Sequence, residues 1–187
     1  LLISLSLYYL QRQDTGFDAT NVVAVDLSSS ATVRSDFVQQ VARELEAIPE
    51  IEHVGFSSEV PLVKGRDKRR FFQIEGRQLL HEDERPDALK NEVSANFHQV
   101  LNIPLIQGRY LANSDDKHSP GAIVINQAFA REFFDGENPV GQRISLDLGA
   151  NWLTIRGVVG DIREVGIKIP PVPTFFVPWI ERWQYDL

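Results

Sequence analysis

The sequence predicts an α/β (α+β) fold with two lobes, one built on a βαβ unit and the other smaller and rich in strands. Three observations favour it. Short β-branched runs alternate with short amphipathic segments of helical spacing. Glycine or proline stands at most junctions between these segments. The chain of 187 residues shows no solenoid repeat or low-complexity tract, and its length suffices for one core or two small lobes.

The predicted βαβ unit comes first. Residues 21–27 (N-V-V-A-V-D-L) form a β-branched run typical of a strand buried on both faces. A helix is expected over residues 35–48, with a capping pattern at its start and Pro49 after its end. Alternation in residues 51–57 predicts a second strand, parallel to the first. The apolar residues expected on the buried side of the helix are Phe37, Val38, Val41, Leu45 and Ile48.

Two polar stretches of opposite charge flank the next predicted strand, residues 71–76. Residues 81–87 (H-E-D-E-R-P-D) are mainly acidic, whereas residues 63–70 (V-K-G-R-D-K-R-R) are basic. Positive charge on an exposed loop suits an anionic lipid headgroup or an acidic partner. The alternative is a solvated hairpin loop that the acidic stretch balances, and the sequence favours neither. The predicted contact residues are Lys64, Arg66, Lys68, Arg69 and Arg70.

The second half of the chain predicts further strands around two short helices. The first helix carries Phe97, Val100 and Leu101, with His98 expected on its solvent side. The second is capped by Asn126. A turn is expected at residues 107–109. The apolar side of the second helix is expected to carry Phe129, Ala130, Phe133 and Phe134. Strands are expected at residues 92–95, 122–125, 143–147, 152–159 and 174–178, the fourth antiparallel to the third.

Composition excludes several classes of site. The chain has no cysteine, which excludes disulfides and thiolate metal sites. Its net charge of -7 argues against a nucleic-acid partner. Residues 157–161 (G-V-V-G-D) lack the third glycine of a dinucleotide-binding fingerprint and predict a strand that ends in a turn. The histidines, none of them spaced as metal ligands, are His53, His81, His98 and His118.

Nucleophiles and paired carboxylates are equally sparse. Asp115 and Asp116 would form an acid–base pair with Asp161 only if folding brought them together, and loop aspartates more often form turns and caps. No serine lies in a G-x-S-x-G elbow, and no Walker motif occurs. We therefore expect no catalytic residue, no cofactor and no metal site.

Both ends of the chain predict a membrane flank. Residues 1–10 (L-L-I-S-L-S-L-Y-Y-L) are uncharged and apolar, about half of the ~20 residues that span a bilayer. Residues 1–13 are therefore expected to be the end of a truncated transmembrane helix, with a buried terminal strand or helix as the alternative. The aromatic cluster near residue 180 suggests that residues 181–187 approach the next membrane helix, with a C-terminal strand and its edge as the alternative. The absence of methionine agrees with a piece of a longer chain.

A series of motifs resembles MacB-like permeases, and most closely the duplicated-orphan-permease branch of the MacB/FtsX superfamily. Each motif is weak alone, but their order along the chain makes the combination specific. The motifs are D-T-G-F-D-A-T-N-V-V-A-V (14–25), A-I-P-E-I-E-H-V (47–54), E-V-P-L (59–62), V-S-A-N-F (93–97), L-N-I-P-L-I-Q-G-R (101–109), I-V-I-N-Q-A-F-A-R-E-F-F (123–134), N-P-V-G-Q-R-I (138–144) and G-V-V-G-D-I-R (157–163).

This resemblance implies a periplasmic core domain over residues 14–180, between membrane helices one and two of an inner-membrane permease. Its lobes would be residues 21–62 with 89–134, and residues 63–88 with 138–170. The resemblance implies no catalytic residues in this domain. A cytoplasmic ATPase would act through the membrane helices, and the permease, a dimer at full length, would transmit conformational change to a periplasmic partner or substrate. A free-standing extracytoplasmic binding protein is the alternative, and a secreted enzyme is a third.

Overall fold

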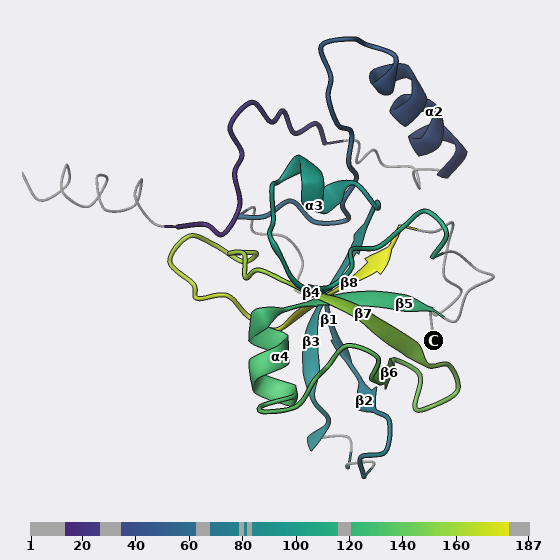
Figure 1. Cartoon of the computed structure of the whole chain (residues 1–187), viewed down its shortest axis with the longest axis vertical. Coiled ribbons are helices and arrows are strands. Elements are labelled where there is room, and N and C mark those ends of the chain that lie inside the picture. Colours follow the sequence, from purple (N-terminus) through teal and green to yellow (C-terminus); the bar gives the residue numbers. More distant parts are fainter. Residues whose placement is uncertain are drawn as a thin grey trace, which may run out of the picture.

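The computed structural model describes residues 14–26, 35–62, 68–78, 81, 84–115 and 121–179. Its helices are α2 (Ser35–Glu46), α3 (Phe97–Val100) and α4 (Gln127–Phe133). Its strands are β1 (Arg69–Phe71), β2 (Gln73–Ile74), β3 (Asp87–Val93), β4 (Leu105–Gly108), β5 (Ala122–Asn126), β6 (Arg143–Ser145), β7 (Leu153–Val159) and β8 (Thr174–Pro178) (Figure 1). The predicted mixed α/β class is confirmed.

One sheet holds all of these strands, and a single segment joins its two ends. The strand order is β1-β3-β8-β5-β7-β6-β2, with β4 attached to β7. β1 and β2 lie at opposite ends of this order, yet only Phe72 separates them in the chain. Residues 69–74 therefore pair with β3 through one half and with β6 through the other. The result is a sheet that curls round on itself, referred to below as the curled sheet.

Alternation along the strands gives the curled sheet an apolar interior. Ile123 and Ile125 of β5 pack in one buried cluster with Ile155 of β7 and Phe175 of β8. α4 covers this cluster at the end where β5 finishes, and Phe129 on α4 is fully buried. Because side chains alternate between the two faces of a strand, this interior follows directly from the apolar runs in the sequence.

A second cluster covers the opposite face of the same strands. Val124 of β5 and Phe176 of β8 pack there against Phe97 of α3. Tyr110 and Phe17 lie against its margin. The molecule therefore has three layers, with α4 on one side of the central strands and α3 with its neighbouring loops on the other (Figure 1).

Most predictions for the second half of the chain are confirmed with shifted bounds. β6 and β7 are antiparallel, as expected. Asn126 caps α4, because its side chain accepts a hydrogen bond from the Phe129 N–H at 2.9 Å.

The turn expected at residues 107–109 is wrong in part, since Gly108 ends β4. A Cβ on Gly108 would lie 2.2 Å from the carbonyl oxygen of Arg156, so this glycine permits close strand pairing as well as a positive φ.

The predicted βαβ unit is wrong. Its helix forms as α2, but residues 22–26 and 51–56 are not strands. Val23 and Val25 are 85% and 72% exposed. β-branched residues favour a strand only where neighbouring strands supply backbone partners and burial, and here the parallel pairs are β3 with β8 and β5 with β7.

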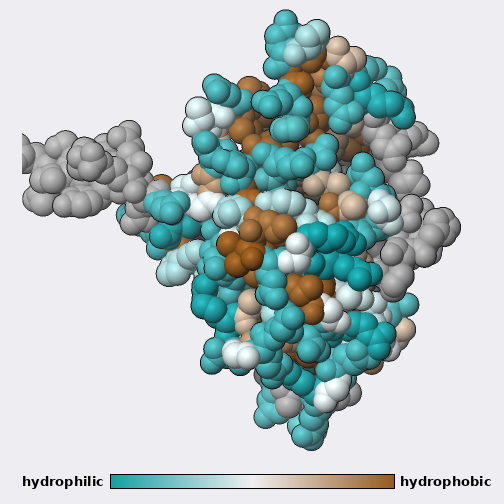
Figure 2. Space-filling model, viewed as in Figure 1, coloured by the Kyte–Doolittle hydropathy of each residue, from teal (hydrophilic) through white to brown (hydrophobic). Residues whose placement is uncertain are grey.

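The predicted buried face of α2 is confirmed only in part. Val38 is buried, whereas Phe37 is 50% exposed and Ile48, just beyond the helix, is 42% exposed. Helix α2 stands apart from the curled sheet, and apolar side chains gather on the side that it turns toward the rest of the molecule (Figure 2). A helical pattern therefore predicted the element but not how closely it packs.

The predictions of two lobes and of membrane flanks fall only partly on residues that the structure describes. Strands from both predicted lobes, such as β1 and β5, belong to the same sheet, and the residue boundaries of the lobes stay a prediction. Residues 1–13 and 181–187, where membrane flanks were expected, lie outside the described residues. Within the described ranges, none of the helices has the length and apolar character that crossing a bilayer requires.

Replacing Phe129 by alanine should lower the free energy of unfolding by about 3–5 kcal/mol, since it empties space in the interior of the curled sheet. Urea denaturation measures this change. Phe71→Ala is the matched control, because Phe71 is 54% exposed and should lose much less. Equal losses for the two variants would show that Phe129 is not part of the core.

Candidate interaction site at the end of strand β3

The last part of β3 is paired with a segment that follows α2. β1 pairs only with the first residues of β3, up to Leu89. Beyond that point the Ser58 N–H donates to the Glu92 carbonyl at 2.8 Å, and the Ser94 N–H donates to the Phe56 carbonyl at 3.0 Å. The segment that carries α2 is thus attached to the sheet edge by backbone hydrogen bonds.

The last described residues of the chain attach to the same place. The Trp179 N–H, directly after β8, donates to the Val93 carbonyl at 2.7 Å. Ser57 forms an antiparallel bridge with Val93 from the other side. The end of β3 therefore joins the segment that follows α2 to the segment that leaves β8. We call this meeting point, residues 56–59, 91–94 and 179, the β3 junction.

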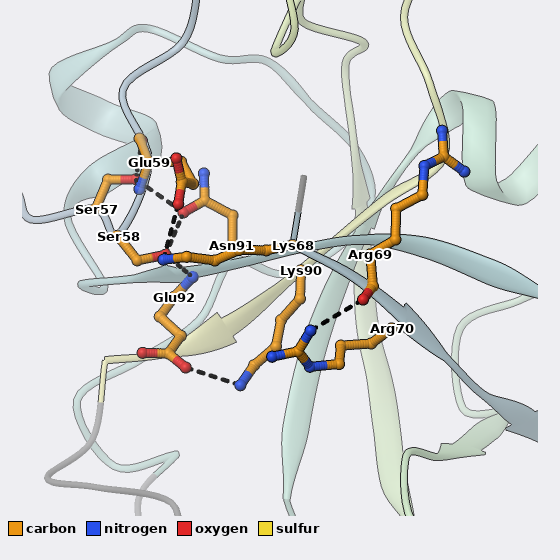
Figure 3. Close-up of polar contacts among 9 residues, drawn as sticks. All are labelled: Ser57, Ser58, Glu59, Lys68, Arg69, Arg70, Lys90, Asn91 and Glu92. Carbon is orange, nitrogen blue, oxygen red and sulfur yellow. Dashed lines mark hydrogen bonds and ion pairs between the residues drawn. The ribbon is translucent and has the colours of Figure 1, made fainter. Parts of the chain in front are cut away.

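A buried asparagine organises the side chains of the β3 junction. Asn91 is 2% exposed, and its Oδ1 accepts hydrogen bonds from the Ser57 hydroxyl at 2.9 Å and the Ser58 hydroxyl at 3.2 Å (Figure 3). The Ser58 hydroxyl oxygen in turn accepts from the Glu92 N–H at 3.0 Å. Sequence reasoning missed these three residues, although an asparagine within a strand was a usable signal, because asparagine is depleted there.

The described basic residues of the predicted contact stretch have partners within the chain. The Lys68 ammonium lies 2.7 Å from the Glu59 carboxylate. Arg69 pairs with Asp87 at 2.8 Å, and Asp87 belongs to the acidic stretch that was expected to balance it. Such exposed pairs each contribute about 0–1 kcal/mol, so they orient the side chains more than they stabilise the fold.

Arg70 differs from its neighbours. Its guanidinium donates to the Arg69 carbonyl at 3.0 Å, and within the described ranges it has no carboxylate partner (Figure 3). Lys64 and Arg66 lie outside the described residues. The role of the five basic residues as a contact surface stays a prediction.

Glu164 lies next to the β3 junction and is almost fully buried. It is 8% exposed, and its Oε1 has no hydrogen-bond partner among the residues that the structure places. Burial raises the pKa of Glu164 to about 7; the nearby Asn91 amide lowers it, and the Glu59 charge raises it further. The carbonyl of Glu164 accepts from the Leu62 N–H at 3.0 Å, which ties this loop to the segment after α2.

His98 contradicts its predicted place on the solvent side of α3. It is 1% exposed, and its ring stacks on Tyr110 at a centroid distance of 5.1 Å and meets the Phe176 ring edge-on at 5.2 Å. Neither ring nitrogen has a hydrogen-bond partner within the described part of the chain. Burial lowers the pKa of His98 to about 4. A helix of four residues is too short for its pattern to define a buried side, which explains the error.

The loop aspartates have structural partners. Both terminal nitrogens of Arg109 contact Asp115, at 2.6 and 2.7 Å, and this pairing lowers the pKa of Asp115. Asp161 accepts from the Ala128 N–H at 2.6 Å and from Arg131 at 2.7 Å. Asp116 lies outside the described residues. Across the described ranges, no three His, Asp or Glu residues are grouped so that they could hold a metal ion.

Nearly the whole chain matches a known family. The model of the MacB-like periplasmic core domain matches residues 2–187. No curated protein sequence matches the chain significantly.

Two solved structures share the fold. The periplasmic region of MacB from Actinobacillus actinomycetemcomitans aligns with a TM-score of 0.51 and 18% identity over 75% of this chain and 54% of that one. The extracellular domain of the noncanonic ABC-type transporter YknZ from Gram-positive bacteria aligns with a TM-score of 0.51 and 16% identity over 81% of this chain and 65% of that one. The chain thus spans between about half and two thirds of these two structures.

Replacing Glu164 by glutamine should remove a pH dependence of stability. Folding raises the pKa of this carboxyl from 4.5 to about 7, so its contribution is complete below pH 4.5 and is lost as the pH rises to about 7. The difference between the two values corresponds to on the order of 3 kcal/mol. Glu164→Gln should therefore unfold at higher urea concentration than the unmodified chain above pH 7, and at a similar concentration near pH 4.5.

Replacing His98 by phenylalanine should have the opposite pH signature. Folding lowers the pKa of His98 from 6.5 to about 4, so acidification between these values protonates only the unfolded chain and destabilises the fold, by on the order of 3 kcal/mol in total. His98→Phe removes this loss and an unpartnered buried ring N–H.

Each substitution is the control for the other. Between pH 4.5 and 6.5 the stability of Glu164→Gln should rise with pH, because His98 remains, and that of His98→Phe should fall, because Glu164 remains. Parallel urea profiles for the two variants would contradict both assignments.

Proposed function

Because this chain belongs to the family of MacB-like periplasmic core domains, we propose that it transmits conformational change within an ABC-type transporter permease. In this proposal the domain lies on the periplasmic side of the inner membrane and is not itself an enzyme. A cytoplasmic ATPase supplies the energy and acts through the membrane helices of a dimeric permease. The domain passes the resulting movement to a periplasmic partner or substrate.

The attachment of both described ends of the chain supports this role. Near the first end, the Arg163 N–H donates to the Thr15 carbonyl at 3.0 Å, and its guanidinium Nε donates to the Asp14 carbonyl at 2.9 Å. At the other end, Trp179 is bonded to Val93. The first end is therefore fixed to the loop that follows β7, and the other end to β3 of the curled sheet.

The β3 junction is the single observation that carries the proposal. Trp179 and the segment after α2 bond to neighbouring residues of one strand, and Asn91 fixes the serines of that segment. Movement of the chain beyond β8 would shift the end of β3 and turn α2, which stands apart from the curled sheet (Figure 1). The stiff element is the sheet, and the element that changes orientation is α2.

Spin labels in the full-length permease test this proposal. The chain lacks cysteine, so Gln40→Cys on α2 and Glu132→Cys on α4 supply labelling positions within the domain. Electron–electron distance measurements on the permease bound to its ATPase should give different distributions with and without trapped ATP. Asn91→Ala should reduce this difference, because it removes the acceptor that holds Ser57 and Ser58.

Asn138→Ala is the matched control. Asn138 is exposed and bonds to Gln107, away from the β3 junction, so the response to ATP should persist in this variant. Distances that do not respond to ATP would refute the proposal. Equal responses in the two asparagine variants would refute the role of the β3 junction.

A further inference from the structure

A cavity of about 70 Å³ opens at one end of the curled sheet. Two of its lining residues, Ala122 and Leu153, are the first residues of β5 and β7. Helix α4 follows the last residue of β5, so the cavity lies at the end of the curled sheet that α4 does not cover. Strand-built enclosures commonly bind ligands at such an open end.

The floor of the cavity is apolar and rigidly held. Leu146, Leu153 and Val177 line it. Leu153 lies on β7, which pairs with β6, and Val177 lies on β8, which pairs with β3. Leu153 and Val177 are also members of the interior cluster, so the cavity continues the packed core outward. The small volume limits an occupant to a short apolar group, because a single water molecule already needs ~10–15 Å³ of such space.

Two cations stand at the edge of this apolar floor. Arg70 of β1 and Lys90 of β3 both line the cavity and come from adjacent strands (Figure 3). Arg70 uses one terminal nitrogen on the Arg69 carbonyl, which leaves its other N–H groups to bind a carboxylate or phosphate. Lys90 contacts Glu92 at 2.7 Å and has two further protons to donate.

The one carboxylate among the lining residues, Asp147, accepts hydrogen bonds from its own turn. Asp147 accepts hydrogen bonds from the Ser145 hydroxyl at 2.8 Å, from the Asn151 N–H at 2.8 Å and from the Asn151 side-chain amide at 2.7 Å. These neutral donors orient the carboxylate but do not cancel its charge. Arg70 has no carboxylate partner within the described ranges, so its remaining N–H groups are open to an anionic ligand.

We propose that this cavity binds a small amphipathic anion, a carboxylate or phosphate carried on a short apolar chain. The apolar chain lies on Leu146, Leu153 and Val177, and the anionic group accepts hydrogen bonds from Arg70, with Lys90 beside it. This assigns a specific ligand site to one residue of the predicted basic stretch. The site does not depend on the role of the domain in a permease.

Titration of the chain with hexanoate and with hexyl phosphate tests the site. Nitrogen–proton NMR spectra should show saturable shifts at the amides of Leu153 and Val177 with at least one of these anions, and comparison of the two identifies the preferred anionic group. Arg70→Gln should weaken that binding about tenfold or more, as expected when a charged hydrogen-bond donor is removed. Arg70 is exposed, so the variant should keep the melting temperature of the unmodified chain.

Arg77→Gln is the matched control, since Arg77 pairs with Glu137 and lies over Phe134, beside the end of α4. Its affinity for the anion should be unchanged. The proposal is overturned if neither anion gives saturable shifts or if the two arginine variants bind equally well. Uncharged hexanol binding as tightly as hexanoate, or acetate binding as tightly as hexanoate, would also overturn it.

Discussion

The pairing of residues 69–74 with both ends of the strand order is the constraint on which the rest of the structure depends. β1 pairs with β3 and β2 with β6, while Phe72 between them is buried against α4, with its ring 4.9 Å from those of Phe129 and Phe133. One segment thereby turns an open sheet into an enclosure. α4 fills one end of that enclosure, and the cavity beside Arg70 remains at the other.

The shortness of β1 has a second consequence. It covers β3 only as far as Leu89, and the Lys90 N–H still bonds to the Lys68 carbonyl, so the backbone from Asn91 onward is left for other partners. Residues 56–58 take one side of this strand end and Trp179 takes the other. Because β1 is short, the end of β3 is open to form the β3 junction, where the segment carrying α2 meets the segment that leaves β8.

Buried polar groups surround this framework on both faces of the sheet. The Asn91 side-chain oxygen accepts from two serine hydroxyls, but its amide nitrogen, both ring nitrogens of His98 and Oε1 of Glu164 have no partner within the described residues. Burial favours the neutral form of both Glu164 and His98, which moves their pKa values in opposite directions. Buried polar side chains without a full set of partners lower the stability of the fold. Core packing alone therefore does not explain why Asn91, Glu164 and His98 stand at these positions.

The sequence by itself determined the local elements of the second half, because their signals are local. Short apolar runs predicted β5 and β8, alternation predicted β7, and Asn126 predicted the start of α4 through a cap that reaches only three residues along the chain. The sequence also located a basic and an acidic stretch. In the structure Arg69 of the first pairs with Asp87 of the second. The family resemblance rested on the same local motifs, and the match over residues 2–187 confirms it.

Only the tertiary structure decided which strands became neighbours. Residues 22–26 have a strand-forming composition but form no strand, and Val23 and Val25 remain exposed, because the sheet pairs other segments instead. The burial of His98, the joining of the sheet ends by residues 69–74 and the meeting at Asn91 all depend on contacts between residues far apart in the chain. A pattern of local period carries no information about such partners, since it fixes which face is apolar but not what covers it.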